Sequence, residues 1–313
     1  MRALAVVLAL SALAAAAPAR AVVAAGGDGT GHATPPANDP GFAHVAALGD
    51  LTGVYLGGGW ILTADHVPPD RDAVILGVTY AAVPGSRIVL ETAPGVPADL
   101  ALYRIEGDPG LPWLEIASSP PVVGEPVVMV GQGWTRLASP AYWDAAWQPT
   151  TPAMAAHAGF ERGVGRALRW GTNEVVVVDD EVVLGGRTTT SFATTFDEGV
   201  SADEAQAVQG DSGGAVFAQR AGDGVWELAG AMFTVGLWIG QPADTVVFGT
   251  ATYAVQLADY REAIEAVTRP AVPAAPAPWR VLAGVSLLAL AARAASARTL
   301  SARARRRTDR AAT

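Results

Sequence analysis

The chain has no cysteine and no lysine among its 313 residues. Without cysteine it forms no disulfide, binds no structural zinc through thiolates and has no thiolate nucleophile. Without lysine the glycine run at 57–59 cannot belong to a phosphate-binding loop of the kind found in nucleotide hydrolases. The four histidines are scattered at positions 32, 44, 66 and 157, so we expect no metal and no other cofactor.

Charged residues are scarce as well, at 16% of the chain, and they are unevenly placed. From Trp279 onward there are eight arginines and one aspartate, so the preceding body is more acidic than the net charge of −9 alone indicates. Nucleic-acid binding needs a basic face that neutralises phosphates. We therefore expect no nucleic-acid partner for the body of the protein.

The first 21 residues have the three parts of a secretory signal peptide in the usual order. Arg2 gives the positive start, an apolar run covers 3–17, and Ala19-Arg20-Ala21 is a small-x-small cleavage site. Cleavage after Ala21 would make Val22 the first residue. The alternative, a buried N-terminal helix, does not account for this order. We expect an exported protein in the periplasm, at the cell surface or outside the cell.

The remaining sequence is typical of a turn-rich β protein, with 35 glycines and 22 prolines. Residues 22–41 form an extended lead-in, and short β-type runs follow in two sets, over 42–120 and 121–268, the second of which includes separate runs at 174–178 and 181–184. This spacing predicts a barrel or a sandwich, without the helices of a parallel βαβ fold. One helix is predicted at the end of the second set, where Leu257, Tyr260, Ile264 and Val267 share a face.

Residues 134–173 have no clear periodicity and contain four tryptophans, at positions 134, 143, 147 and 170. A stretch of this length is expected to be a long loop. Two interpretations stay open: a functional loop, or a surface insertion whose tryptophans pack on the barrel.

Three short motifs carry the candidate chemistry. They are Trp60-Ile-Leu-Thr-Ala-Asp-His66-Val67, Ala98-Asp99-Leu-Ala-Leu-Tyr103 and Gln209-Gly-Asp-Ser212-Gly-Gly214. A serine hydroxyl is a weak nucleophile until a base takes its proton, and an imidazole can do this near neutral pH. A buried carboxylate then fixes the imidazole tautomer and stabilises the cation that forms.

These motifs, in the order His, Asp, Ser, resemble the signatures of the trypsin-like serine proteases over about residues 42–268. The resemblance implies an all-β fold of two packed antiparallel Greek-key β-barrels with a short C-terminal helix. It also implies a catalytic triad of His66, Asp99 and Ser212 acting on protein or peptide substrates. From the residues alone, Asp70 or Asp72 could take the place of Asp99.

The same resemblance assigns two further roles. The N–H groups of Gly210 and Ser212 would form the oxyanion hole. Gln206, six residues before Ser212, would lie at the base of the specificity pocket, where trypsins carry an acidic residue. Preference for uncharged residues over Lys or Arg is expected. Asp203 and Glu204 are close in sequence, but counting six residues back from Ser212 does not place either of them at the base of the pocket.

This chain departs from the family pattern at two further points. The cysteines that brace its histidine and serine loops are replaced by Val67 and Val208, and Asp65 stands where a small residue is usual. In the family, the counterpart of Asp211 is neutralised by a freed apolar N-terminus. Here the partner could be the amino group of Val22 after signal cleavage, or else an arginine or backbone N–H groups.

The C-terminal segment has a proline-rich spacer over 269–278, an apolar run over 281–292 and a basic end. The apolar run is shorter than the roughly 20 residues that span a bilayer. The three parts, which together cover 269–313, resemble bacterial sorting tails of the PEP-CTERM kind, although Pro276-Ala-Pro278 replaces Pro-Glu-Pro. A disordered or amphipathic terminus is the alternative. Membrane contact is expected only through this tail and the signal peptide.

The sequence therefore predicts a secreted serine endopeptidase. A catalytically inactive, protease-shaped binding module is the alternative from another class. An α/β-hydrolase would need its nucleophile first in the chain and a Gly-x-Ser-x-Gly elbow, whereas Ser212 comes last in Gly-Asp-Ser-Gly-Gly.

Overall fold

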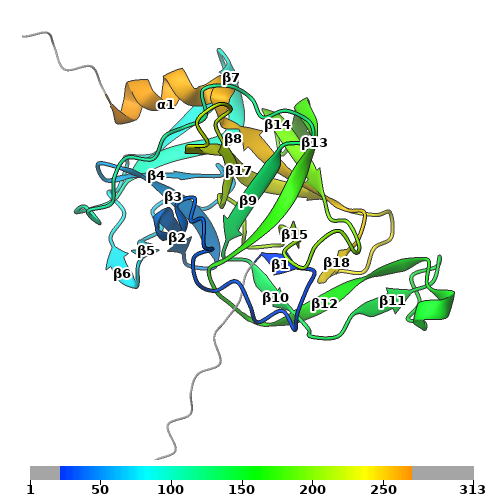
Figure 1. Cartoon of the computed structure of the whole chain (residues 1–313). Coiled ribbons are helices and arrows are strands. Elements are labelled where there is room, and N and C mark those ends of the chain that lie inside the picture. Colours follow the sequence, from blue (N-terminus) through cyan, green and yellow to red (C-terminus); the bar gives the residue numbers. More distant parts are fainter. Residues whose placement is uncertain (1–21, 270–313) are drawn as a thin grey trace, which may run out of the picture. The chain divides into compact units, whose positions relative to one another are not determined.

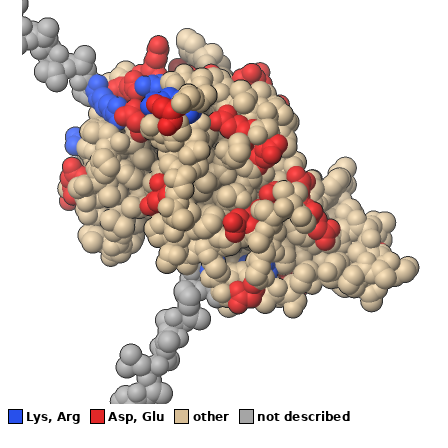
Figure 2. Space-filling model, viewed as in Figure 1, with Lys and Arg blue, Asp and Glu red and all other residues tan. Residues whose placement is uncertain are grey.

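The computed structural model describes residues 22–269. The predicted signal peptide lies outside the described residues, and so does the predicted sorting tail after residue 269. Within the described part, no helix is long and apolar enough to cross a membrane. Acidic side chains are spread over the face in Figure 2, whereas basic ones are few.

The first half of the described chain forms a seven-stranded antiparallel sheet in the order β6-β5-β2-β3-β4-β8-β7. It follows a short 3-10 helix, η1, and its strands are bounded as follows: η1 Phe42–His44, β2 Val45–Leu48, β3 Leu51–Gly57, β4 Trp60–Thr63, β5 Ala73–Ile75, β6 Val78–Tyr80, β7 Ile88–Ala93 and β8 Val96–Arg104. The central strands β3, β4 and β8 read as nearly continuous apolar runs because they are buried along most of their length.

Six later strands close into a barrel in the order β13-β14-β19-β17-β16-β9. Their bounds are β9 Pro126–Gly131, β13 Arg169–Leu184, β14 Arg187–Thr195, β16 Ala215–Gln219, β17 Trp226–Gly236 and β19 Ala251–Gln256. In Figure 1 this barrel lies beside the first sheet. One apolar cluster includes residues of both, such as Leu62 and Leu102 from the first sheet and Phe217 and Leu228 from the barrel. The two halves therefore share a core.

Strand β13 corrects one expectation. The runs Glu174–Val178 and Glu181–Leu184 read as two strands because Asp179-Asp180 resembles a turn. The structure has a single strand of 16 residues, with register shifts against β14 on either side of Val177. Asp179 has a φ of 54°, so the two aspartates mark an irregularity within the strand rather than its end.

Residues 134–166 are not the long loop that the sequence predicts. They form β10 Trp134–Arg136, β11 Ala141–Trp143, the 3-10 helix η2 Pro152–Met154 and β12 His157–Arg166. Strand β12 pairs with β10, β11 and β18 (Thr245–Val247), and this small sheet projects from the barrel as an arm (Figure 1). The periodicity was invisible because β12 contains Gly159, Gly163 and Gly165 and is only partly buried.

The lead-in is extended and held against the second barrel. Strand β1 (Val23–Ala24) pairs with β15 (Ala205–Gln206). The buried guanidinium of Arg136 donates hydrogen bonds to the carbonyls of Ala24 (2.8 Å), Gly26 (2.7 Å) and Gly27 (2.7 Å). Several consecutive carbonyls bound by one guanidinium fix the path of this segment.

The described part of the chain closes with the helix that the apolar periodicity predicts, as η3 Leu257–Tyr260 followed by α1 Arg261–Thr268. Leu257, Tyr260 and Ile264 are buried on its inner face. The prediction of an all-β fold with one short C-terminal helix is confirmed.

Candidate active site

The structure brings His66, Asp99 and Ser212 into one hydrogen-bonded chain. His66 lies in the loop after β4, Asp99 in β8, and Ser212 in the turn before β16. The His66 Nδ1 atom is 2.7 Å from Asp99 Oδ2, and its Nε2 atom is 2.8 Å from Ser212 Oγ. The His66 backbone N–H also donates to Asp99 Oδ1 at 2.9 Å. The carboxylate therefore holds both the ring and the backbone of the histidine.

Asp99 is 2% exposed. Burial by itself would raise its pKa, but hydrogen bonds from His66 and the positive charge of Arg187 outweigh burial and hold the pKa of Asp99 below its ordinary value. Its own backbone N–H donates to Thr189 Oγ1 at 2.9 Å. Asp99 thus stays ionised at neutral pH, as a carboxylate that orients an imidazole must.

The sequence left Asp70 and Asp72 open as alternatives to Asp99. In the structure both have a local role in the chain that follows His66. Asp70 occupies a turn with a φ of 56°. Asp72 accepts a hydrogen bond from the Ala82 N–H at 3.0 Å. The carboxylate bonded to His66 is that of Asp99.

The serine turn needs glycine at two positions. Gly210 has a φ of 108°, which residues with a side chain rarely adopt, and a Cβ atom there would come within 2.9 Å of the Asp50 carbonyl oxygen. Gly213 has a φ of 84°, and its Cβ would meet the Thr52 carbonyl. Among the described residues, the N–H groups of Gly210 and Ser212 have no hydrogen-bond acceptor. Both predicted oxyanion-hole donors are therefore available to an incoming oxygen.

Asp211 is fully buried beneath this turn. Burial raises its pKa to about 6, against hydrogen bonds from the backbone N–H groups of Val208, Gly133 and Val22 and the charge of Arg166. The N–H donors of Gly133 and Val208 lie 2.6 and 2.8 Å from its oxygens. The sequence left the partner of Asp211 open between the Val22 nitrogen and backbone N–H groups. In the structure both kinds of donor lie at the same carboxylate.

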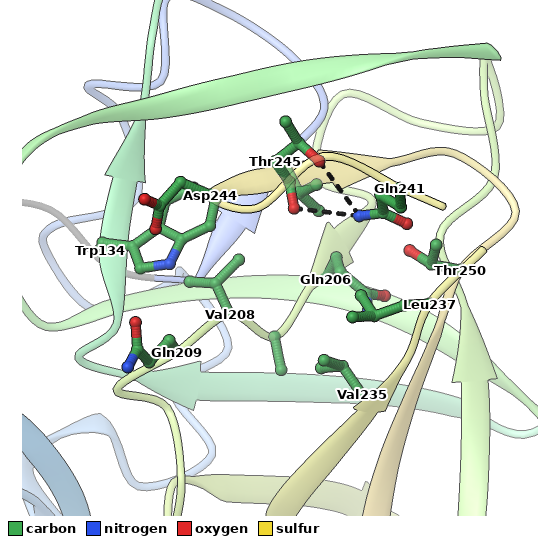
Figure 3. Close-up of a pocket in the computed structure, with 12 residues that line it drawn as sticks. Trp134, Gln206, Val208, Gln209, Val235, Leu237, Gln241, Asp244, Thr245 and Thr250 are labelled. Atoms are coloured by element: carbon green, nitrogen blue, oxygen red, sulfur yellow. Dashed lines mark hydrogen bonds between the residues drawn. The ribbon is translucent and has the colours of Figure 1, made fainter. Parts of the chain in front are cut away.

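Two adjoining cavities, of about 200 and 150 Å³, lead from Ser212 to Gln206. They share four lining residues: Ala207, Val208, Gln209 and Val235. Figure 3 shows Gln206 in the middle of the inner cavity. Its side-chain amide donates to the Ala251 carbonyl at 2.9 Å, while its Oε1 atom is buried and has no hydrogen-bond partner among residues 22–269. The predicted pocket residue thus lines a cavity continuous with the nucleophile.

Neither Asp203 nor Glu204 lines the two cavities. Asp203 accepts a hydrogen bond from His32 at 2.7 Å. The inner cavity has one carboxylate in its wall, that of Asp244, which is paired with Arg162 at 2.9 Å. Among the described residues, the inner cavity around Gln206 therefore has no carboxylate that lacks an ion pair, and the carboxylate of the outer cavity, that of Asp211, is fully buried and bonded to backbone N–H groups.

Two residues at the site were not identified from the sequence. Thr189 comes from β14, far along the chain from Asp99, and lies in a threonine run with no motif of its own. Trp134, from the arm, lines the inner cavity (Figure 3). Trp147 of the same segment stacks on His157 with ring centroids 4.0 Å apart. Trp134 thus forms part of a cavity wall, whereas the half-buried Trp147 stacks on a residue of the same segment.

Within residues 22–269, no group of three or more His, Asp or Glu side chains could hold a metal ion.

Comparisons with known proteins identify a family for the chain. The sequence matches the family of trypsin-like peptidase domains over residues 51–225. Among solved structures, it is similar to neuropsin, a serine protease expressed in the limbic system of mouse brain, with 17% identity and a TM-score of 0.45 over 75% of this chain and 97% of that one. It is also similar to kallikrein-related peptidase 10, with 16% identity and a TM-score of 0.47 over 75% and 100% of the two chains. No curated protein sequence matches the chain.

Proposed function

Because the chain belongs to the trypsin-like peptidase family, we propose that it is an active serine endopeptidase that cleaves peptide bonds through an acyl-enzyme intermediate. The observation that carries this proposal is the unbroken hydrogen-bonded chain from Asp99 through His66 to Ser212. Ser212 Oγ attacks the scissile carbonyl carbon while His66 Nε2 takes its proton. The N–H groups of Gly210 and Ser212 stabilise the oxyanion, and His66 then protonates the leaving amine.

Deacylation repeats these steps with water. Water gives its proton to His66 Nε2 and attacks the acyl carbon, and the Ser212 oxygen leaves with that proton. We expect the substrate to bind as an extended strand beside the triad, with its cleavage-site side chain in the cavities that lead from Ser212 to Gln206.

An inactive binding module is the second candidate, and one labelling experiment separates the two. A fluorophosphonate probe should label the wild-type protein covalently at Ser212, because the probe needs a serine activated by its histidine. Failure of folded wild-type protein to react would favour the binding module.

We propose that the enzyme prefers uncharged residues at the cleavage site. A buried Lys or Arg side chain would have to lose its hydration opposite Gln206, a neutral amide. The unpaired Oε1 of Gln206 instead suits a substrate side chain that donates a hydrogen bond, since an unsatisfied buried acceptor is costly.

Matched peptides test this preference. A citrulline substrate should have a kcat/KM at least about 10-fold above its arginine counterpart, because the two differ mainly in charge. A glutamine substrate should also exceed its methionine counterpart, and Gln206→Leu should abolish that difference. Faster cleavage after arginine than after citrulline would contradict the proposal.

We further propose that export switches the enzyme on. Signal cleavage after Ala21 would turn the Val22 N–H, which is already hydrogen-bonded to Asp211, into a charged amino group. A buried carboxylate paired with a cation is far more favourable than an unpaired one. The bonds from Arg136 to Ala24, Gly26 and Gly27 support this, because they hold the new N-terminus in place. The sorting tail would retain the enzyme at the membrane until it is processed.

Comparing a protein that starts at Val22 with one that carries an extra Met-Gly tests the activation step. The extended protein should have a kcat/KM lower by about 10-fold or more, since a full charge pair at a buried site is lost. Its stability should also fall as pH rises from about 4 to about 6, because Asp211 with its pKa of about 6 holds a proton that the unfolded chain has released. The processed protein should lack this fall. Equal activity, with the extension confirmed by mass, would exclude the mechanism.

A further inference from the structure

Three charged side chains form an ion-pair cluster directly beside His66. Arg87 donates to Asp65 Oδ1 at 3.0 Å, and Arg187 lies 2.6 Å from Asp65 Oδ2. Arg87 also donates to the Asp65 backbone carbonyl at 2.7 Å. The Asp65 side chain is 10% exposed. Both the side chain and the backbone of the residue that precedes the histidine are therefore fixed.

The two arginines come from different halves of the fold. Arg87 precedes β7 of the first sheet, whereas Arg187 is the first residue of β14 in the second barrel. Asp65 and Arg187 are separated by 122 positions in sequence. Two residues further along β14, Thr189 accepts the hydrogen bond from the Asp99 N–H. The start of β14 thus contacts both the histidine loop and the strand of the acid.

The positive and negative charges of the cluster compensate one another. A carboxylate this buried needs a cation, and Asp65 has two guanidinium partners with most of their surface covered. The second positive charge has a further effect, because Arg187 also helps to hold the pKa of Asp99 below its ordinary value. Two carboxylates, those of Asp65 and Asp99, are therefore balanced by the two guanidinium groups of Arg87 and Arg187.

We propose that Asp65, Arg87 and Arg187 are positioning residues that brace His66 across the two halves of the fold. The inference rests on the proposed peptidase function. Because the chain has no cysteine, no disulfide can hold the loop that contains His66. Small displacements of a reacting group cost rate, about 10²-fold for 1 Å. The brace keeps His66 Nε2 within 2.8 Å of Ser212 Oγ without touching the substrate.

The test uses Asp65→Asn, Arg187→Gln and the double variant. Each single variant should lower kcat by about 10- to 100-fold with KM within about two-fold of wild type, because ring placement and not substrate binding changes. The double variant should be about as slow as Asp65→Asn alone, since Asp65→Asn already removes the Asp65–Arg187 pair and Arg187→Gln then breaks no further contact of Asp65. Arg187→Lys should recover part of the loss. Asp223→Asn, which breaks the exposed pair with Arg220 in a surface turn, is the matched control and should match wild type.

Proton NMR provides a readout that does not depend on turnover. The downfield signal of the His66 Nδ1 proton bonded to Asp99 should shift or broaden in Asp65→Asn and stay unchanged in Asp223→Asn. If Asp65→Asn does not fold, Arg187→Gln, which leaves the Arg87 pair intact, carries the test. Normal kcat and an unchanged NMR signal in a folded Arg187→Gln protein would overturn the brace. Absence of activity in the wild type itself would instead refute the peptidase function.

Discussion

Replacing Ser212 with alanine is expected to lower kcat by about 10⁶-fold, because the nucleophile and the proton that His66 accepts are both lost. The substitution leaves the fold unchanged, since the Ser212 hydroxyl makes its hydrogen bond only to His66 among the described residues. Turnover of a fluorogenic peptide with a neutral cleavage-site residue measures the loss. Thermal unfolding of the same sample shows that the protein is folded.

The matched control is Ser118→Ala, which removes the hydroxyl of an exposed serine in the segment between the two halves of the fold. It should keep wild-type turnover and wild-type reaction with the fluorophosphonate probe. Ser212→Ala should lose both. Wild-type turnover in a Ser212→Ala protein of verified mass would show that the nucleophile lies elsewhere.

The parts of the site that can be predicted from the sequence are the residues that lie in contiguous motifs. His66 and Ser212 are each flanked by residues that shape their own turn, such as Gly210 and Gly213 with their positive φ angles. Their chemistry can be read locally for that reason. The choice of Asp99 over Asp70 and Asp72 came from the family resemblance, since an acidic residue before an apolar strand is common.

The parts that the sequence could not predict depend on contacts between distant segments. Arg187 and Thr189 reach the triad from β14, and no spacing rule relates them to Asp65 or Asp99. Strand β13 was divided at Asp179 because a turn and a bulge use the same residue types. The arm was missed because its glycines interrupt the period-2 pattern by which strands are recognised.

Asp99→Asn is expected to lower kcat by about 10⁴-fold at neutral pH. The carboxylate now accepts from both the Nδ1–H and the backbone N–H of His66. One face of an asparagine side chain donates instead of accepting. Because the backbone N–H still needs the oxygen, the amide NH₂ turns toward Nδ1 and stabilises the tautomer whose proton is on Nε2. That tautomer cannot take the proton of Ser212.

Asp72→Asn is the matched control for this charge change, because its carboxylate accepts from the Ala82 N–H and not from His66. It should retain activity within about two-fold, as expected for a substitution away from the reacting groups. In Asp99→Asn, KM should change far less than kcat, since Asp99 acts on the imidazole and does not line the two cavities beside Ser212. A loss of activity in Asp72→Asn combined with normal turnover in Asp99→Asn would reassign the orienting carboxylate, and with it the mechanism.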